Sequence, residues 1–386
     1  MKSRALLLGL LLSVLSCGAF AASPEKALSG VLEAIEANRL DLAMQRVEKL
    51  LAEHPNFRLG HLIRGDLLLA RARPLETFGN VPKTVPREKV EDLRAEALQR
   101  LLALRDRPNA NRVPRYVLQL RDDQKHAIIV DSRRSRLYLF ENVGGRAHLV
   151  SDYYVTLGKN GVEKTREGDQ KTPIGVYHVT ANLPRQKLTD FYGVGAYPIN
   201  YPNAWDKKLG RNGHGIWLHG TPSDTYSRPP RASDGCIVLA NTDLEAVGKN
   251  LQIGLTPVII ADEIDWTDAA SLERERKGLA DAVESWRLDW ESRDTARYLG
   301  HYAARFSAGG EDLATWSEHK RKVNAGKSWI KVGLGRVSMF QYPREKFVVV
   351  SFDQDYRSNN LSNVMRKRQY WVHEGARWKI LYEGAE

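Results

Sequence analysis

The spacing of apolar residues changes twice along this sequence, and that change limits the possible folds more than any other feature. Apolar residues recur at helical spacing from residue 24 to 105 and follow strand patterns from 115 to 264. Helical spacing returns from residue 268, before a last set of strand patterns. A chain of 386 residues has the length of two or three domains. We therefore predict a multidomain α+β protein.

The first of these parts, residues 22–110, is predicted to be a helical module. Asn38-Arg39 and Pro55-Asn56 supply the breaks between helices. One stretch is similar to a single tetratricopeptide-type hairpin, but stacked repeats need at least three copies for stability. We therefore expect a packing or dimerisation module, with a peptide-binding groove as the alternative. The predicted helices cover residues 28–35, 42–51, 59–72 and 90–104.

Two further domains are predicted after a Pro- and Arg-rich linker at residues 105–116. Residues 115–264 read as a mostly-β domain with long loops, and residues 265–386 as an α+β cone in which helices precede an antiparallel meander. Strands are expected at 126–131, 136–141, 148–158, 175–181, 214–220 and 256–261, and a helix at 241–249. In the cone, helices are expected within 268–305 and strands at 329–340, 346–356, 365–374 and 378–383.

Residues 1–21 have the pattern of a cleavable signal peptide. A short basic start precedes an apolar stretch at 5–15, and Ala19-Phe20-Ala21 is a small-residue cleavage site. Lipidation of Cys17 is the alternative, which the poor match of Val14-Leu15-Ser16 disfavours. No later stretch reaches the ~18 apolar residues of a spanning helix. The sequence therefore predicts an exported protein with no transmembrane anchor once the signal is removed.

Composition and charge limit the classes of partner that this protein is expected to bind. Hydrophobic residues make up 42% of the chain and charged residues 27%, which excludes a disordered chain. The net charge is 58 − 47 = +11. No nucleic-acid-binding motif accompanies it, and an exported protein rarely meets nucleic acid. An anionic wall polymer or membrane surface is the expected partner.

The sequence predicts that any reaction centres on Cys236, because it is the only thiol that remains once Cys17 is removed with the signal peptide. It is either a buried inert thiol or a reactive one, and its surroundings favour the second. His219 lies 17 residues earlier and can act as its general acid and base. Gly235 allows close backbone approach, so its N–H can help to hold an oxyanion. Ser233 can orient the loop or the substrate amide.

The segment around these residues resembles the catalytic domain of the L,D-transpeptidases. The resemblance rests on the strand ending in His219-Gly220, the S-x-G-C sequence at 233–236, the helix start at 241–243 and the TPIGVYHV stretch at 172–179. It covers about residues 120–264. It implies that Cys236 is the nucleophile and His219 the base, with a backbone carbonyl as the third member. It requires no cofactor and no metal.

Two positions depart from the family pattern. Asp234 stands where the family commonly has His, and Val238 where it has Arg or Asn. An ionised Asp234 beside the thiol would raise the thiol's pKa. Further contacts to substrate are expected from the residues around the pair: His214, Gly220, Thr221, Ser233, Asp234 and Arg231. Arg228 and Arg231 either solubilise their loop or meet substrate carboxylates.

The domain order is similar to that of the helical-cell-shape L,D-carboxypeptidases, whose C-terminal domain is NTF2-like. Together the resemblances imply a periplasmic enzyme that attacks the third residue of a peptidoglycan tetrapeptide stem. A Cys236 thioester would form, D-alanine would leave, and an amine or water would accept the acyl group. A strict carboxypeptidase and a catalytically silent wall-binding adaptor are the alternatives. The cone is expected to bind a glycan or a protein. Its ligand, the acyl acceptor and the oligomeric state stay open.

Overall fold

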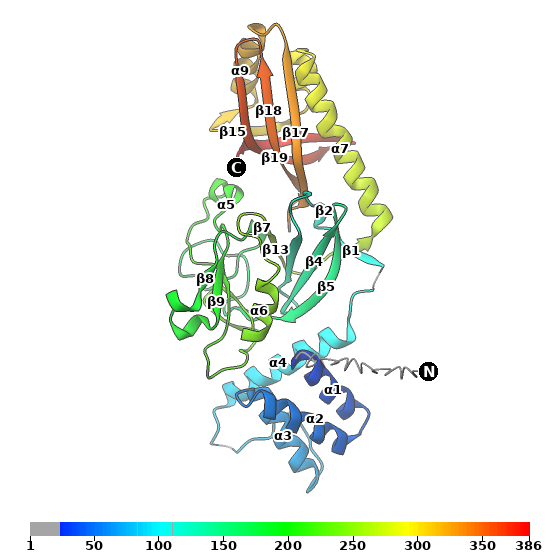
Figure 1. The fold of residues 1–386 in the computed structure, drawn as a ribbon, viewed down its shortest axis with the longest axis vertical. Helices are drawn as coiled ribbons and strands as arrows, with labels where there is room; N and C mark the ends of the chain where they lie inside the picture. The colour runs from blue at the N-terminus through cyan, green and yellow to red at the C-terminus, as the bar shows by residue number, and fades with distance from the viewer. Residues whose placement is uncertain (1–23, 83, 110) are drawn as a thin grey trace, which may run out of the picture.

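The computed structural model describes residues 24–386 apart from 83 and 110, so the predicted signal peptide of residues 1–21 and Cys17 lie outside the described residues. The chain forms three parts stacked along the long axis of the molecule (Figure 1). The helical module lies at one end, the mostly-β part in the middle and the C-terminal cone at the other end. This mixed α+β architecture confirms the predicted fold class.

The helical module has its helices where the sequence predicted them: α1 (Pro24–Glu36), α2 (Leu40–Glu53), α3 (Arg58–Ala70) and α4 (Arg87–Arg105). Their apolar faces form one core that contains Val31, Val47 and Phe57. The same core includes Tyr226 and Ala240, which belong to the mostly-β part. The module is therefore packed directly against the middle of the molecule.

The middle part is built on a sheet of strand order β5-β4-β3-β13-β7, beside a smaller sheet β12-β10-β9-β8 and the pair β11-β6. The strands are β3 (His126–Asp131), β4 (Arg136–Val143), β5 (Arg146–Tyr154), β6 (Leu157–Gly158), β7 (Gly175–His178), β8 (Leu183–Pro184), β9 (Gly195–Pro198), β10 (Trp217–His219), β11 (Arg231–Ser233), β12 (Ile237–Val238) and β13 (Pro257–Ala261). The helices are η1 (Arg185–Lys187), η2 (Asp190–Tyr192), α5 (Ala204–Lys208) and α6 (Asn241–Gly248).

The predicted strand 214–220 is shorter in the structure. It begins only at Trp217, because Gly213 and Gly215 have φ angles of 110° and 74°, outside the extended region of a regular strand. His214 therefore lies in a loop, so strand alternation does not set its direction.

The cone has its sheet in the order β16-β15-β20-β19-β18-β17-β2. Its elements are α7 (Ala269–Glu291), α8 (Thr295–Leu299), β15 (Tyr302–Ala308), β16 (Glu311–Asp312), α9 (Leu313–Ala325), β17 (Ile330–Gln341), β18 (Phe347–Ser358), β19 (Ser362–Glu374) and β20 (Arg377–Ala385). The four predicted strands of the meander are confirmed. The prediction that helix continues to residue 305 is wrong. Tyr302 and Phe306 lie on β15, where pairing with β20 overrides their helical spacing.

Two short strands tie the parts together and were not predicted. The expected linker contains β1 (Arg112–Pro114), which pairs with β14 (Trp266–Asp268). β2 (Val117–Gln119) comes from the segment assigned to the middle domain but pairs with β17 of the cone. Trp205 of α5 also crosses this junction, with its ring 4.6 Å from Phe347.

Candidate active site

The loop between His219 and Cys236 returns the chain to a neighbouring strand. β10 and β12 are parallel, with His219 opposite Val238. His219 ends β10, and Cys236 immediately precedes β12. Paired strands lie ~4.8 Å apart. The register sets Cys236 level with Trp217, two residues before His219, so the predicted nucleophile and base lie at adjacent strands of the small sheet.

The imidazole of His219 is buried, with only 1% of the residue exposed. Its Nδ1 lies 2.7 Å from the carbonyl oxygen of Gly220. Because a carbonyl only accepts hydrogen bonds, Nδ1 carries the proton, and Nε2 keeps its lone pair. The pKa of His219 is lowered to about 4, mainly by burial and also by the charge of Arg228, against the hydrogen bond to Gly220. His219 is thus a neutral base at pH 7.

The thiol of Cys236 is also neutral. Its pKa is raised to about 11, mainly by burial and also by the carboxylate of Asp234. The backbone N–H of Trp217 and the charges of Arg228 and Lys164 act in the opposite direction. Sγ donates a hydrogen bond to the carbonyl of Gly215 at 3.3 Å. Within the described residues no hydrogen bond joins the thiol to His219, so this is a resting state with the proton on sulfur.

Gly235 has the backbone geometry that only glycine adopts easily at this site. Its φ is 123°, and a Cβ would lie 2.7 Å from the carbonyl oxygen of Lys171. Its N–H donates to Ser233 Oγ at 3.1 Å, and its carbonyl accepts from Thr172 Oγ1 at 3.0 Å. Ser233 Oγ in turn donates to the carbonyl of Cys236 at 2.6 Å. Ser233 therefore holds the turn, and the N–H expected to face an oxyanion is occupied.

Asn241, the first residue of α6, holds the backbone that follows His219 at the end of β10. The sequence predicted it only as part of a helix start. Its Nδ2 donates to the carbonyl of Thr221 at 2.9 Å, and its Oδ1 accepts from the N–H groups of Thr221 and Val194, each at 3.2 Å. A Cβ on Gly220 would lie 2.1 Å from this Oδ1. Thr221 is itself buried, with Oγ1 donating to the carbonyl of Tyr226 at 3.3 Å. Gly220 and Thr221 thus position the base.

Three other residues predicted to contact substrate bond to partners outside the catalytic pair. Nδ1 of His214 lies 3.5 Å from Glu167, and both side chains are exposed. Arg231 donates to the carbonyl of Ser132 at 2.9 Å. Asp234 forms an exposed ion pair with Lys159 at 3.0 Å. The contact partners of these three residues thus lie outside the catalytic pair, although the charge of Asp234 still acts on the thiol.

Residues 161–173 form a loop that is fixed next to Gly235, because Thr172 Oγ1 donates to the carbonyl of Gly235 at 3.0 Å. Buried Lys164 pairs with Asp169 at 2.7 Å. Asn212 joins the loop to the segment before β10, because its Oδ1 accepts from the N–H of Glu167 at 3.0 Å and its own N–H donates to Thr165 at 3.2 Å.

Aromatic side chains cover the other side of the base, and sequence reasoning missed them. The rings of Phe191 and Tyr192 lie 5.8 and 5.1 Å from the imidazole of His219. Tyr192 also contacts Trp217 at 4.9 Å. Both residues belong to η2, which is too short to show a helical spacing of apolar residues in the sequence. The guanidinium of Arg228 stacks over Phe191 at 4.7 Å.

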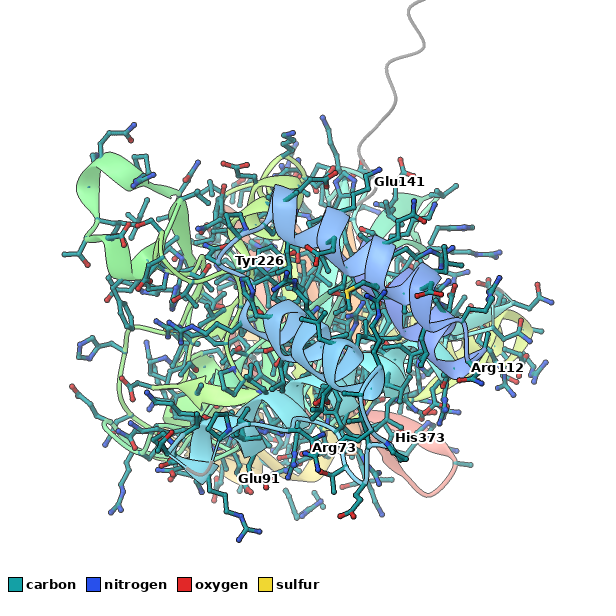
Figure 2. All side chains as sticks on the ribbon, turned by 90° about the horizontal axis from the view of Figure 1, so that it is seen from below. Arg73, Glu91, Arg112, Glu141, Tyr226 and His373 are labelled. Carbon is teal, nitrogen blue, oxygen red and sulfur yellow. The ribbon has the colours of Figure 1, made fainter. Side chains whose placement is uncertain are left out.

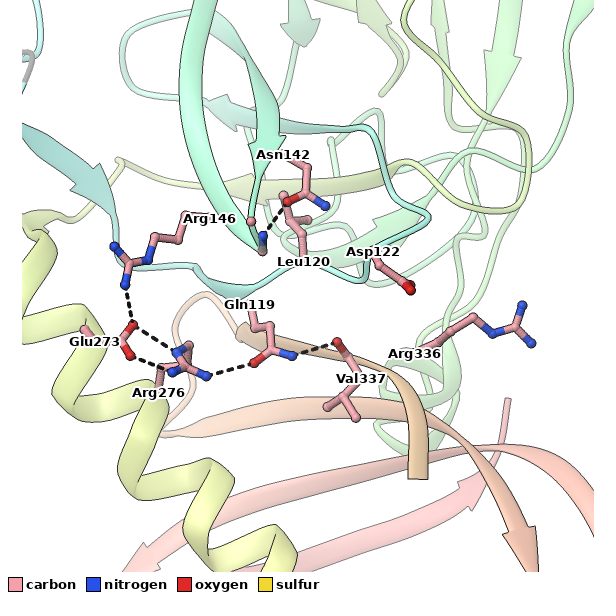
Figure 3. Close-up of a pocket in the computed structure, with 11 residues that line it drawn as sticks. Gln119, Leu120, Asp122, Asn142, Arg146, Glu273, Arg276, Arg336 and Val337 are labelled. Atoms are coloured by element: carbon pink, nitrogen blue, oxygen red, sulfur yellow. Dashed lines mark hydrogen bonds and ion pairs between the residues drawn. The ribbon is translucent and has the colours of Figure 1, made fainter. Parts of the chain in front are cut away.

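A separate cavity of about 610 Å³ lies at the junction between the middle part and the cone. Figure 3 shows Arg146, Glu273, Arg276 and Gln119 joined by hydrogen bonds and ion pairs across it, ending on the carbonyl of Val337. None of the residues of the catalytic pair lines it. Within the described chain, no cluster of His, Cys, Asp and Glu is placed to hold a metal, and no helix is long and apolar enough to cross a membrane.

Two family matches agree with this geometry. Residues 125–260 match the L,D-transpeptidase catalytic domain, and residues 278–384 match the Cds6 C-terminal NTF2-like domain. None of the curated proteins matches the chain.

Solved structures extend the similarity across both domains. Bd1075 of Bdellovibrio bacteriovorus is 29% identical, with a TM-score of 0.62 over 71% of this chain and 98% of that chain. The helical cell shape determining protein Pgp2 of Campylobacter jejuni is 25% identical, with a TM-score of 0.60 over 70% of this chain and 95% of that chain. Residues 125–260 therefore belong to the L,D-transpeptidase catalytic domain family, and residues 278–384 form an NTF2-like domain, the architecture that Bd1075 and Pgp2 share.

Proposed function

We propose that this protein is an exported peptidoglycan-remodelling enzyme that acts on tetrapeptide stems through Cys236. The family match and the likeness to Pgp2 support peptidoglycan modification of the L,D-transpeptidase or L,D-carboxypeptidase type. One observation carries the finer proposal. Parallel pairing of the adjacent strands β10 and β12 puts His219 at the end of one and Cys236 at the start of the other, and a carbonyl holds Nδ1 of the histidine, which leaves Nε2 free to take a proton.

The reaction begins from the neutral pair. Nε2 of His219 takes the proton of Cys236 as the sulfur attacks the carbonyl carbon of the third stem residue. The carbon–nitrogen bond to D-alanine then breaks, and His219 returns the proton to the leaving amine. A thioester remains on Cys236. Water or an amine, deprotonated by His219, attacks it and releases the tripeptide or a cross-linked product.

The acyl acceptor decides between the two enzyme classes. The domain order, similar to that of the helical-cell-shape L,D-carboxypeptidases, favours water, whereas the match to the L,D-transpeptidase catalytic domain favours an amine. A silent wall-binding adaptor is the second candidate, and the raised pKa of Cys236 is the observation that favours it.

The test is incubation of the mature protein with disaccharide-tetrapeptide, followed by mass spectrometry. We expect disaccharide-tripeptide and free D-alanine, or dimers linked through third residues. Cys236→Ala should lower turnover by roughly 10⁴-fold or more. Intact tetrapeptide in the wild-type sample would contradict the enzyme and support the adaptor. Equal turnover by Cys236→Ala would exclude the thioester.

A further inference from the structure

Arg228 has an unpaired charge beside the catalytic pair. Its side chain is half-buried, and within the described residues its guanidinium has no hydrogen-bond acceptor and no ion-pair partner. It stacks 4.7 Å from the ring of Phe191, which also lies 5.8 Å from the imidazole of His219. A partly desolvated cation without a partner is costly, and structures normally pair it. The missing partner points to an anionic ligand.

The backbone of Arg228 is fixed before any ligand arrives. Its carbonyl accepts hydrogen bonds from Tyr154 at 2.9 Å and from Thr156 at 3.0 Å. Pro229 and Pro230 follow and restrict the backbone further. The guanidinium thus starts from a rigid base, which reduces the entropy lost when it binds an anion.

The helical module holds the rest of this loop. Ser227 Oγ donates to buried Glu96 of α4 at 2.7 Å. Tyr226 packs on Phe57 at 4.4 Å, beside the N-terminal helices (Figure 2). Asn56 donates to the carbonyl of Ser223 at 3.1 Å. The module therefore positions the loop that presents Arg228.

The charge of Arg228 reaches both reacting groups. It lowers the pKa of Cys236 and that of His219. Conversely, Asp234 and Cys236 are the groups that raise the pKa of Arg228 against its burial. An anion bound by Arg228 would therefore lie within electrostatic range of the reaction centre.

We infer that Arg228 binds the carboxylate of the D-amino acid that leaves during acyl transfer, and this inference rests on the proposed function. His219 must protonate the leaving nitrogen, and the carboxylate is attached to the carbon next to that nitrogen. The ligand's carboxylate is thus on the side of the site where Phe191 and Arg228 cover His219. A guanidinium matches a carboxylate in geometry as well as charge.

The first test needs no turnover. Iodoacetate carries a carboxylate and iodoacetamide an uncharged amide of similar size, and both alkylate Cys236. The ratio of the two rates cancels any change in the thiolate fraction. We expect Arg228→Gln to lower the iodoacetate-to-iodoacetamide ratio about tenfold and Arg228→Lys to preserve most of it. Arg133→Gln is the matched control. Arg133 lies on the turn after β3, its side chain is 75% exposed, and it pairs with Glu263.

The second test uses tetrapeptide with a free terminal carboxylate and its carboxamide analogue. Wild type should prefer the free acid, and Arg228→Gln should lose about 10–100-fold in kcat/KM on the acid while changing little on the amide. Equal alkylation ratios in wild type and Arg228→Gln would overturn the inference. If wild type leaves tetrapeptide intact, the proposed function fails, yet the alkylation ratio still decides the role of Arg228.

Discussion

Nδ1 of His219 lies 2.7 Å from the carbonyl oxygen of Gly220, the next residue in the chain. A backbone carbonyl thus holds the tautomer of the base, a task that a carboxylate performs in many hydrolases. The position of this carbonyl depends on Asn241, which bonds both backbone groups of Thr221. The orientation of the base therefore depends on one amide side chain.

Asn241→Ala should lower kcat about 10–100-fold with little change in KM, because His219 would lose its fixed orientation. D-alanine release measured as a function of pH provides the test. Asn250→Ala is the matched control, since that side chain bonds only to the carbonyl of Ala246 in the preceding turn. An Asn241→Ala enzyme with wild-type kcat and pH profile would contradict the positioning role.

Alkylation of Cys236 by iodoacetamide should be slow at neutral pH. Its pKa of about 11 lies above the ~8.5 of a free thiol, so the thiolate fraction at pH 7 is roughly 300-fold smaller. The rate should rise about tenfold per pH unit up to about pH 11. Because Arg228 lowers this pKa, Arg228→Gln should react still more slowly with this neutral reagent. A rate that levels off below pH 9 would show an activated thiolate instead.

Arg100 should be the most costly charged residue of the helical module to remove. Its buried guanidinium bonds Glu96 through Nη2 at 2.9 Å, also pairs with Glu25 and stacks on Tyr154 at 4.0 Å. Arg100→Ala leaves buried Glu96 without its cation and Glu25 with Arg136 alone, and it should lower the free energy of unfolding by about 3–5 kcal/mol. Urea denaturation would measure it.

Arg105→Ala is the control for Arg100→Ala, because Arg105 forms an exposed pair with Glu36 whose loss should cost at most about 1 kcal/mol. Similar losses of stability in the two variants would show that burial of the Arg100 network is not the cause.

Asp243→Asn should stabilise the protein at alkaline pH. Burial raises the pKa of Asp243 to about 7, with Glu25 adding to the shift, whereas the unfolded carboxyl has its usual value of 3.8. The folded state therefore binds the proton more tightly, and ionised Asp243 opposes folding above pH 7. The free energy of unfolding of Asp243→Asn should exceed that of the wild type by roughly 2–4 kcal/mol at pH 8. This difference should fall towards zero near pH 4.

Unfolding free energies of both proteins across that range would test the Asp243 prediction. Acidification from about pH 6.5 to 4 also destabilises the fold through His219, whose folded pKa is lowered, so its stabilising effect is lost as pH falls. That loss is common to both proteins and cancels in their difference. A gain that does not depend on pH would contradict the burial of a charge at residue 243.

The sequence alone determined the features that follow from local pattern. Helical spacing predicted α1 to α4, and alternation predicted the meander from β17 to β20, because each has its apolar period within its own residues. Residue chemistry and spacing singled out His219 and Cys236, since few side chains can act as base and nucleophile.

Only the tertiary structure decided what depends on contacts between distant residues. β2 pairs with the cone, Asn241 braces the base, Phe191 covers it, and the helical module positions the loop of Arg228. It also showed that the N–H of Gly235 is bonded and that the thiol is protonated, since both depend on burial and on neighbours. Spacing along the chain carries no information about such contacts, because long-range packing selects among many locally equivalent arrangements.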